Sequence, residues 1–100
     1  MKDFADSFLN IEKTLAEDIV KLDYSESKVK YVLNPLDYAL DPHARFLEKY
    51  LQGPRTILFV GLNPGPWGMC QTGVPFGDVT QCRDFLEVTG TVHQPQTLSS

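Results

Sequence analysis

Residues 56–77 read TILFVGLNPGPWGMCQTGVPFG, and this stretch decides the fold that the sequence predicts. Its first part, Thr56 to Leu62, is almost continuously apolar and rich in β-branched residues. That pattern is typical of a strand buried on both faces of a largely parallel sheet. One helix is expected before this strand and another after the loop that follows it. The α–β–loop–α order predicts an α/β layered fold.

Apolar periodicity predicts two helices upstream of the strand. The first spans about Asp3 to Leu22 and carries apolar residues at steps of three and four, which places them on one face. The members of this stripe are Phe4, Phe8, Ile11, Leu15, Ile19 and Leu22. The second spans Asp41 to Gln52, with Asp41 as the capping residue and Pro42 at the first helical position. We expect the first helix to pack its stripe on a core.

Three further expectations concern shorter segments. Val29 to Leu33 is β-branched and aromatic, and predicts an edge strand or an extended arm before Asn34-Pro35. A last helix is expected to begin near Asp78 and to end at Gly90. His43, in the first turns of the second helix, is interpreted as part of a solvated helix face.

Length and composition indicate one soluble globular domain. The chain has 100 residues and a formal net charge of −4, and no run of three basic residues occurs. This charge argues mildly against DNA binding by this stretch alone, because basic patches usually supply non-specific affinity for phosphates. No secretory signal is apparent, and no apolar run approaches the roughly 20 residues that span a bilayer.

The sequence predicts no metal site and no cofactor. Cys70 and Cys82 are expected to be free thiols in a reducing compartment. Their spacing to His93 is wide and a fourth ligand is missing, so this set does not match a zinc site.

The loop Gly61–Gly77 carries the chemistry. It holds five glycines and three prolines, a composition typical of a loop held in a fixed shape. It follows the carboxyl end of the expected strand, where open α/β sheets bind ligands. Asn63 offers an amide at the strand exit, and Phe76 and Trp67 offer rings for stacking on a nucleobase. Two alternatives are a rigid loop whose aromatics only fill a core and, less attractive, a phosphate-binding loop.

The run GLNPGPWGMCQTGVPFG is similar, nearly residue for residue, to the first active-site motif of the single-strand-selective monofunctional uracil-DNA glycosylases. The upstream pieces YVLNPLDYA (31–39) and DPH (41–43) also resemble that family, as do QGP (52–54) and residues 79–86. The similarity covers about residues 5–90. The chain is therefore identified as an N-terminal portion of a member of this family.

The resemblance implies an enzyme that hydrolytically removes uracil, and oxidised uracils such as 5-hydroxymethyluracil, from DNA in base excision repair. It also implies a three-layer α/β/α sandwich. Asn63 matches the family asparagine that positions the attacking water, and Phe76 matches the aromatic that stacks on the flipped base. Leu62 would contact the base largely through its backbone, while Gly65 and Met69 would shape the pocket and the water site.

For the complete family enzyme, the resemblance implies single- and double-stranded uracil-containing DNA as partner, a monomeric state, a nuclear location and no membrane association. This chain lacks the family's second asparagine, its wedge loop and its leaving-group histidine. Most of the central parallel sheet would be missing too. We therefore expect residues 1–90 to be the N-terminal part of the glycosylase domain and residues 91–100 to be a disordered, divergent tail. We also expect the 100-residue form to be unstable or molten, and inactive by itself.

Two other functions stay open at this point. One is a non-catalytic product, either a fragment that does not fold or a module that competes for binding partners. The other is a small α/β protein whose Gly/Pro loop binds a nucleobase or an anion. Substrate preference among damaged pyrimidines does not follow from the residues present.

Overall fold

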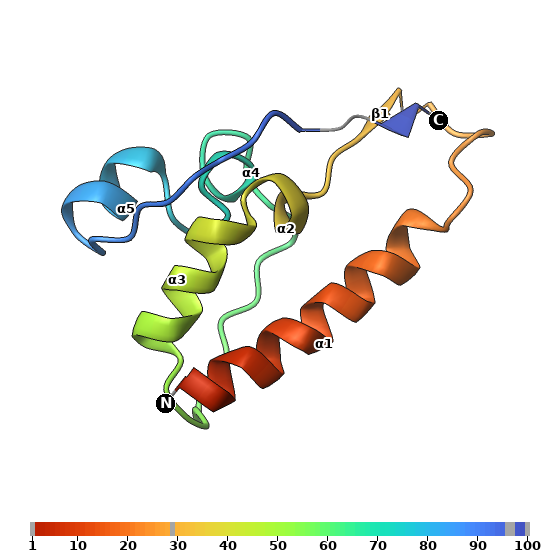
Figure 1. Cartoon of the computed structure of the whole chain (residues 1–100). Coiled ribbons are helices and arrows are strands. Elements are labelled where there is room, and N and C mark those ends of the chain that lie inside the picture. The colour runs from red at the N-terminus through yellow and green to blue at the C-terminus, as the bar shows by residue number, and fades with distance from the viewer. Residues whose placement is uncertain (1, 29, 96–97, 100) are drawn as a thin grey trace.

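Helices make up most of the regular structure of this chain (Figure 1). The computed structural model describes residues 2–28, 30–95 and 98–99. In chain order the elements are α1 (Lys2–Val20), β1 (Tyr31–Val32), α2 (Pro35–Tyr38), α3 (Leu40–Tyr50), α4 (Met69–Thr72), α5 (Val79–Asp84) and β2 (Leu98–Ser99). α3 lies against α1 and α2, and α4 lies against α2 and α5. The fold is thus mixed and mostly helical.

The predicted first helix is confirmed as α1, but it packs through a different face from the one expected. Ala5 is buried, and Leu9, Glu12 and Ala16 are half-buried, at steps of four, three and four. That face meets α3. The predicted stripe is rotated away from it, and Ile11 is 70% exposed. The apolar stripe of α1 is therefore largely uncovered by the described residues.

The predicted second helix is confirmed as α3, although the capping role assigned to Asp41 is wrong. The N-cap of α3 is Ala39, which makes no side-chain hydrogen bond. The Asp41 carboxylate instead accepts from the backbone N–H of Thr91 at 2.7 Å and from Arg45 at 3.1 Å. α2, one residue upstream, has the capped start: Asn34 Oδ1 accepts from the N–H of Leu36 at 3.1 Å.

The predicted strand Thr56–Leu62 is not a strand among the described residues. Residues 51–64 run as an irregular segment between α3 and α1, the green line in Figure 1. A strand exists only through hydrogen bonds to a neighbour, and no described segment pairs with it. Its apolar side chains stay open to solvent: Leu58 is 83% exposed and Val60 is 81% exposed.

The described residues form one sheet, a two-residue antiparallel ladder between β1 and β2. Tyr31 pairs with Ser99, and Val32 pairs with Leu98. β1 confirms the edge strand expected within Val29–Leu33, of which Val29 lies outside the described residues. β2 lies within the segment expected as a tail, and the division into 1–90 and 91–100 stays a prediction. The expected parallel sheet is not part of the described structure.

The last predicted helix is shorter than expected. Asp78 caps α5 as predicted, accepting from the N–H of Gln81 at 2.7 Å. α5 ends at Asp84, so the role given to Gly90 as its C-cap is wrong. Residues 85–90 instead fold back toward α3, where Lys49 Nζ donates to the carbonyls of Leu86 and Glu87 at 2.9 and 3.2 Å.

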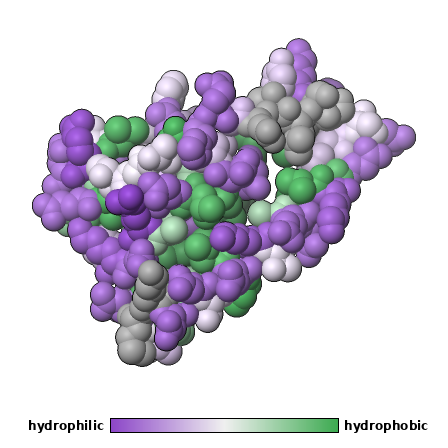
Figure 2. Space-filling view, in the orientation of Figure 1, coloured by the Kyte–Doolittle hydropathy of each residue, from purple (hydrophilic) through white to green (hydrophobic). Residues whose placement is uncertain are grey.

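The small apolar core lies between α3, α5 and the chain that follows α4. Its members are Val74, Cys82 and Val88, with Phe46 and Leu86 packed beside them. Figure 2 shows hydrophobic surface gathered in the middle of the face viewed, bordered by hydrophilic side chains. The loop that the sequence singled out is therefore anchored at its carboxyl end by this core, while its amino end continues into the exposed segment 56–62.

Candidate functional site

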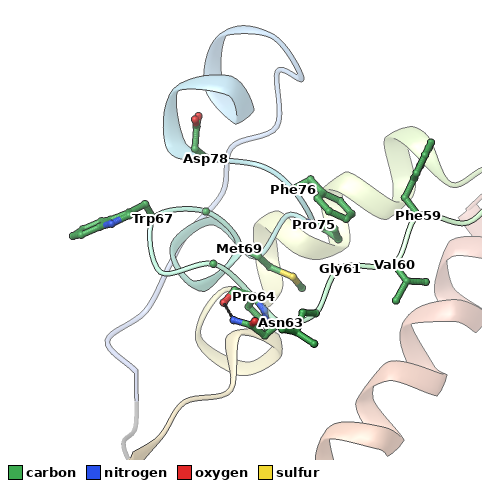
Figure 3. A pocket seen from close by; sticks show the side chains of 13 residues that line it. Phe59, Val60, Gly61, Asn63, Pro64, Trp67, Met69, Pro75, Phe76 and Asp78 are labelled. Atoms are coloured by element: carbon green, nitrogen blue, oxygen red, sulfur yellow. Dashed lines mark hydrogen bonds between the residues drawn. The ribbon is translucent and has the colours of Figure 1, made fainter.

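One open cavity of about 710 Å³ is lined by the loop and the end of the exposed segment (Figure 3). Its lining residues are 59–65, 67–69, 75, 76 and 78. All five residues that the sequence predicted for a site are among them: Leu62, Asn63, Gly65, Met69 and Phe76. The fold thus brings the predicted set together around one hollow.

Asn63 lies at the start of the loop with its side chain exposed to solvent. Its Nδ2 donates to the carbonyl of the next residue, Pro64, at 3.0 Å (Figure 3). Its Oδ1 accepts no hydrogen bond from a described residue. An amide held in this way can offer an acceptor oxygen to a water molecule or to a polar ligand edge.

Phe76 forms the aromatic wall of the cavity. Its ring is 75% exposed, so one face is open to a ligand. Its backbone has φ 59°, in the left-handed region that a bulky residue seldom adopts. The other side of the ring lies against Gly61, where a Cβ would be 3.3 Å from two ring carbons. A residue larger than glycine at position 61 would therefore push the ring from its place.

The other predicted residues have different environments. Leu62 is 100% exposed. The carbonyl of Gly65 accepts from the backbone N–H of Cys70 at 3.0 Å, which closes the turn into α4. Met69 is the first residue of α4 and is half-buried. Trp67 also lines the cavity, and its indole extends away from Asn63 and Phe76 (Figure 3).

Buried polar contacts fix the carboxyl-terminal half of the loop. Thr72 Oγ1 accepts from the N–H of Val74 at 3.1 Å and donates to the carbonyl of Gly77 at 2.7 Å. The N–H of Gly77 also donates to the carbonyl of Val74 at 3.0 Å. These bonds tie residues 72–77 into a closed turn that carries Phe76. Both faces of this turn meet other elements, so Phe76 sits on a rigid support.

The electrostatics of the cavity are weakly acidic. Asp78 is the one titratable group among the lining residues. Behind the loop, burial and the nearby Cys70 raise the pKa of Tyr38, whose hydroxyl donates to the Cys70 carbonyl. Burial also raises the pKa of the Cys82 thiol. Cys82 is therefore not an activated thiolate, and it acts as a core side chain.

The surroundings of the remaining candidate ligands are simple. Among the described residues, no three His, Cys, Asp or Glu side chains gather closely enough to hold a metal ion. The backbone N–H of His93 donates to the carbonyl of Tyr38 at 2.8 Å, which holds the chain after Gly90 against α2. None of the helices described in residues 2–95 has the length and apolarity of a membrane-spanning helix.

The sequence missed His43, which was expected on a solvated face and is only 1% exposed. Its Nδ1 lies 2.7 Å from the carbonyl oxygen of Gly73, and its Nε2 lies 2.7 Å from Glu12 Oε1. A histidine that follows a proline at a helix start gives no local sign that its ring will be buried and hydrogen-bonded. The signal that existed was Glu12, a charged residue in register with Ala5, Leu9 and Ala16.

Comparison with known proteins finds similar sequences. No family model matches the chain. The chain is 46% identical over 94 residues to the single-strand selective monofunctional uracil DNA glycosylase of Bos taurus. The matched residues make up 94% of this chain and 34% of the relative. The corresponding proteins of Rattus norvegicus and Mus musculus are 45% and 46% identical over the same length.

The chain spans about a third of the length of these curated relatives. The matched part includes the loop whose geometry is described above, because it covers 94% of the chain. By sequence, the chain is therefore similar to about a third of each of these single-strand selective monofunctional uracil-DNA glycosylases.

Proposed function

We propose that this chain supplies the first active-site segment of a monofunctional uracil-DNA glycosylase. The observation that carries the proposal is that Asn63 and the open face of Phe76 line one cavity of about 710 Å³. Small-ligand pockets are usually about 300–1,000 Å³, so a single base fits a hollow of this size. The names of the relatives support uracil as that base.

The chemistry follows from the groups present. A base that is flipped out of the stack would lie on the ring of Phe76, with backbone groups of residues 61–65 at its edge. Asn63 Oδ1 would hold the water that attacks the sugar carbon as the bond to the base breaks. An amide is too weak a base to remove the proton before attack, so its contribution is the position of the water.

Two groups needed for fast reaction are not among the lining residues. The departing uracil carries negative charge, and Asp78, the one titratable residue of the lining, is acidic. No amide side chain other than Asn63 lines the cavity to read the base edge. We propose that both groups come from the part of the relatives that this chain does not match. The 100-residue form is then inactive by itself.

The same reasoning applies to the fold. We propose that Thr56–Leu62 becomes a strand of a three-layer α/β/α sandwich once neighbouring strands cover it. Its uncovered apolar side chains support this, since a strand buried on both faces is apolar throughout. The complete protein would act as a monomer on uracil in single- and double-stranded DNA, including oxidised uracils, in base excision repair. A nuclear location goes with that substrate.

A chimera tests the proposal. Residues 1–90 of this chain replace the matched segment of the bovine relative, and uracil release from a single-stranded oligonucleotide is measured. We expect release by the chimera and none by the 100-residue chain. Asn63→Ala should lower the rate of the chimera about 10²-fold, the cost of a misplaced reactant. Asn10→Ala, an exposed amide on α1, is the matched control and should leave the rate unchanged.

Two results would contradict the proposal. An inactive chimera that is folded would show that this loop does not serve the reaction. Equal rates for Asn63→Ala and Asn10→Ala would remove Asn63 from the water site. Binding of free uracil by the chain without release by the chimera would favour the alternative of a nucleobase-binding module.

A further inference from the structure

His43 joins helices α1 and α3 to the loop that carries Phe76, and it has no role in the proposed reaction itself. It belongs to α3, its Nδ1 lies 2.7 Å from the carbonyl of Gly73 after α4, and its Nε2 lies 2.7 Å from Glu12 of α1. The imidazole is 1% exposed, while the Glu12 side chain is 22% exposed. This Glu12–His43–Gly73 relay therefore joins the first helix to the loop that carries Phe76.

The two partners of the ring decide where its protons are. A backbone carbonyl accepts hydrogen bonds and does not donate, so Nδ1 must carry a proton. The 2.7 Å contact between Nε2 and Glu12 Oε1 holds one proton between these two atoms. The ring thus donates from Nδ1 to the Gly73 carbonyl while Glu12 fixes its other nitrogen.

The carbonyl that His43 holds is at a decisive point of the loop. Gly73 is the C-cap of α4 with φ 73°, and it begins the closed turn of residues 72–77. Its backbone packs directly on Ala39, where a Cβ would meet the Ala39 carbonyl oxygen at 2.5 Å. Phe76 follows three residues later. A fixed Gly73 carbonyl therefore fixes the base of the turn that presents the aromatic ring.

We propose that His43 is a positioning residue: held by Glu12 at Nε2, it donates from Nδ1 to the Gly73 carbonyl and thereby sets the orientation of Phe76 at the cavity. Neither His43 nor Glu12 lines the cavity, so both act only through the turn. The inference rests on the proposed function only where it treats Phe76 as the wall of a base-binding site.

The geometry distinguishes this relay from an ordinary buried histidine. A neutral ring that donates from Nδ1 has an acceptor at Nε2, which an apolar neighbour would leave without a partner. Here the packed face of α1, which otherwise presents Ala5, Leu9 and Ala16, places a carboxyl group at that position. Both ring nitrogens are therefore held, which suits a contact that must fix a loop.

The first measurement is the proton content of the ring. Two-dimensional ¹⁵N–¹H NMR of the chain at neutral pH reports both ring nitrogens of each histidine. We expect His43 to show a protonated Nδ1 with a slowly exchanging ring N–H signal. His93, in the exposed chain after Gly90, serves as the internal comparison. A His43 ring without a proton on Nδ1 would overturn the inference.

The second measurement is the rigidity of the turn. The N–H of Gly77 is bonded to the carbonyl of Val74, so its hydrogen exchange reports on the turn directly. His43→Ala should raise this exchange rate about tenfold, as expected for loss of a buried hydrogen bond. His43→Asn places an amide N–H near the position of Nδ1 and should restore most of the protection.

Glu12→Gln tests the charge without removing the side chain. The amide keeps the size of the carboxyl group but loses its charge, so it should hold Nε2 less firmly and exchange at Gly77 should rise. Glu17→Gln, an exposed residue of the same helix, is the matched control and should change neither readout. Unchanged Gly77 exchange in both His43→Ala and Glu12→Gln would overturn the inference.

The bovine chimera is a second host for every variant, in case a variant of the 100-residue chain does not fold. There kcat/KM for uracil release should fall about tenfold in His43→Ala and recover in His43→Asn. A loss that His43→Asn does not recover would reduce His43 to a structural role and contradict the proposal. The NMR readouts need no substrate, so an inactive parent chimera would count against the glycosylase function and leave the relay decided by NMR.

Discussion

At the scale of single residues, Gly73 is the position where backbone conformation and available space both exclude a side chain. Its φ of 73° is costly for an L-residue by about 1–2 kcal/mol. A Cβ would also meet the carbonyl oxygen and the Cβ of Ala39 at 2.5 and 2.9 Å. Overpacking typically adds about 1–3 kcal/mol. We predict that Gly73→Ala lowers the free energy of unfolding of the bovine chimera by about 3 kcal/mol, measured by urea unfolding followed by circular dichroism.

Gly53→Ala provides the control for that experiment. Nothing lies within 4 Å of a Cβ at position 53, and its φ is not positive. The control should therefore change stability by less than about 0.5 kcal/mol, as surface substitutions usually do. Equal effects of the two substitutions would show that the turn after α4 is not held in the conformation described here.

Residues also show where inference from sequence succeeds and where it stops. The cavity contains all five residues named from the motif, because a loop dense in Gly and Pro has few conformations and keeps near neighbours together. Their roles stay predictions. His43 was missed because its two partners lie 31 and 30 positions away in the chain. No local pattern encodes a contact at that separation.

At the scale of elements, Asp41 links α3 to the chain that follows Gly90. The backbone N–H of Thr91, and then Arg45, hold the pKa of Asp41 below its usual value of 3.8. A carboxyl whose pKa is depressed in the folded state stabilises the contact above its unfolded pKa and loses it as the pH falls through the folded pKa. We predict that the Thr91 amide resonance is constant above about pH 5 and shifts as the pH falls below 4.

Asp41→Asn should abolish the acid transition at Thr91, because an amide does not titrate in this range. The substitution should also raise hydrogen exchange at Thr91 already at neutral pH. Asp18→Asn, an exposed carboxyl on α1, should leave the transition in place. A Thr91 shift that persists in Asp41→Asn would assign the transition to another group.

The sequence predicted some helices and strands correctly and others not, and the reason is physical. α1 and α3 follow from periodicity and the start of α5 follows from capping, and both signals are local. The rotated packing face of α1 does not, because which stripe is covered depends on what lies beside the helix. The segment Thr56–Leu62 has the composition of a strand but no strand beside it among the described residues. Composition predicts which structure a segment can adopt, and pairing with a neighbouring strand decides whether it forms a strand.

At the scale of the whole molecule, two apolar surfaces are left without cover by the described residues. One is the outer stripe of α1, which includes Ile11 and Leu15. The other is the segment 56–62, where every large apolar side chain is at least 72% exposed. Monomeric soluble proteins seldom expose contiguous apolar surface of this kind. Both surfaces agree with a chain that spans about a third of its relatives.

These surfaces lead to a prediction about the chain in solution. We expect it to bind an environment-sensitive hydrophobic dye such as anilinonaphthalene sulfonate, with a clear rise in fluorescence. Leu58→Lys should lower that rise, since Leu58 is 83% exposed within the segment and does not line the cavity. Tyr31→Lys adds the same charge at a 67% exposed aromatic of β1, away from the segment, and should lower the fluorescence rise less.

The bovine chimera should behave differently, because its neighbouring strands would cover residues 56–62. The parent chimera should bind little dye. Leu58→Lys should destabilise the chimera, because the added charge is then buried. Equal dye binding by the chain and the chimera would mean that the remaining two thirds of the bovine relative do not cover this segment, and the proposed sandwich would be wrong.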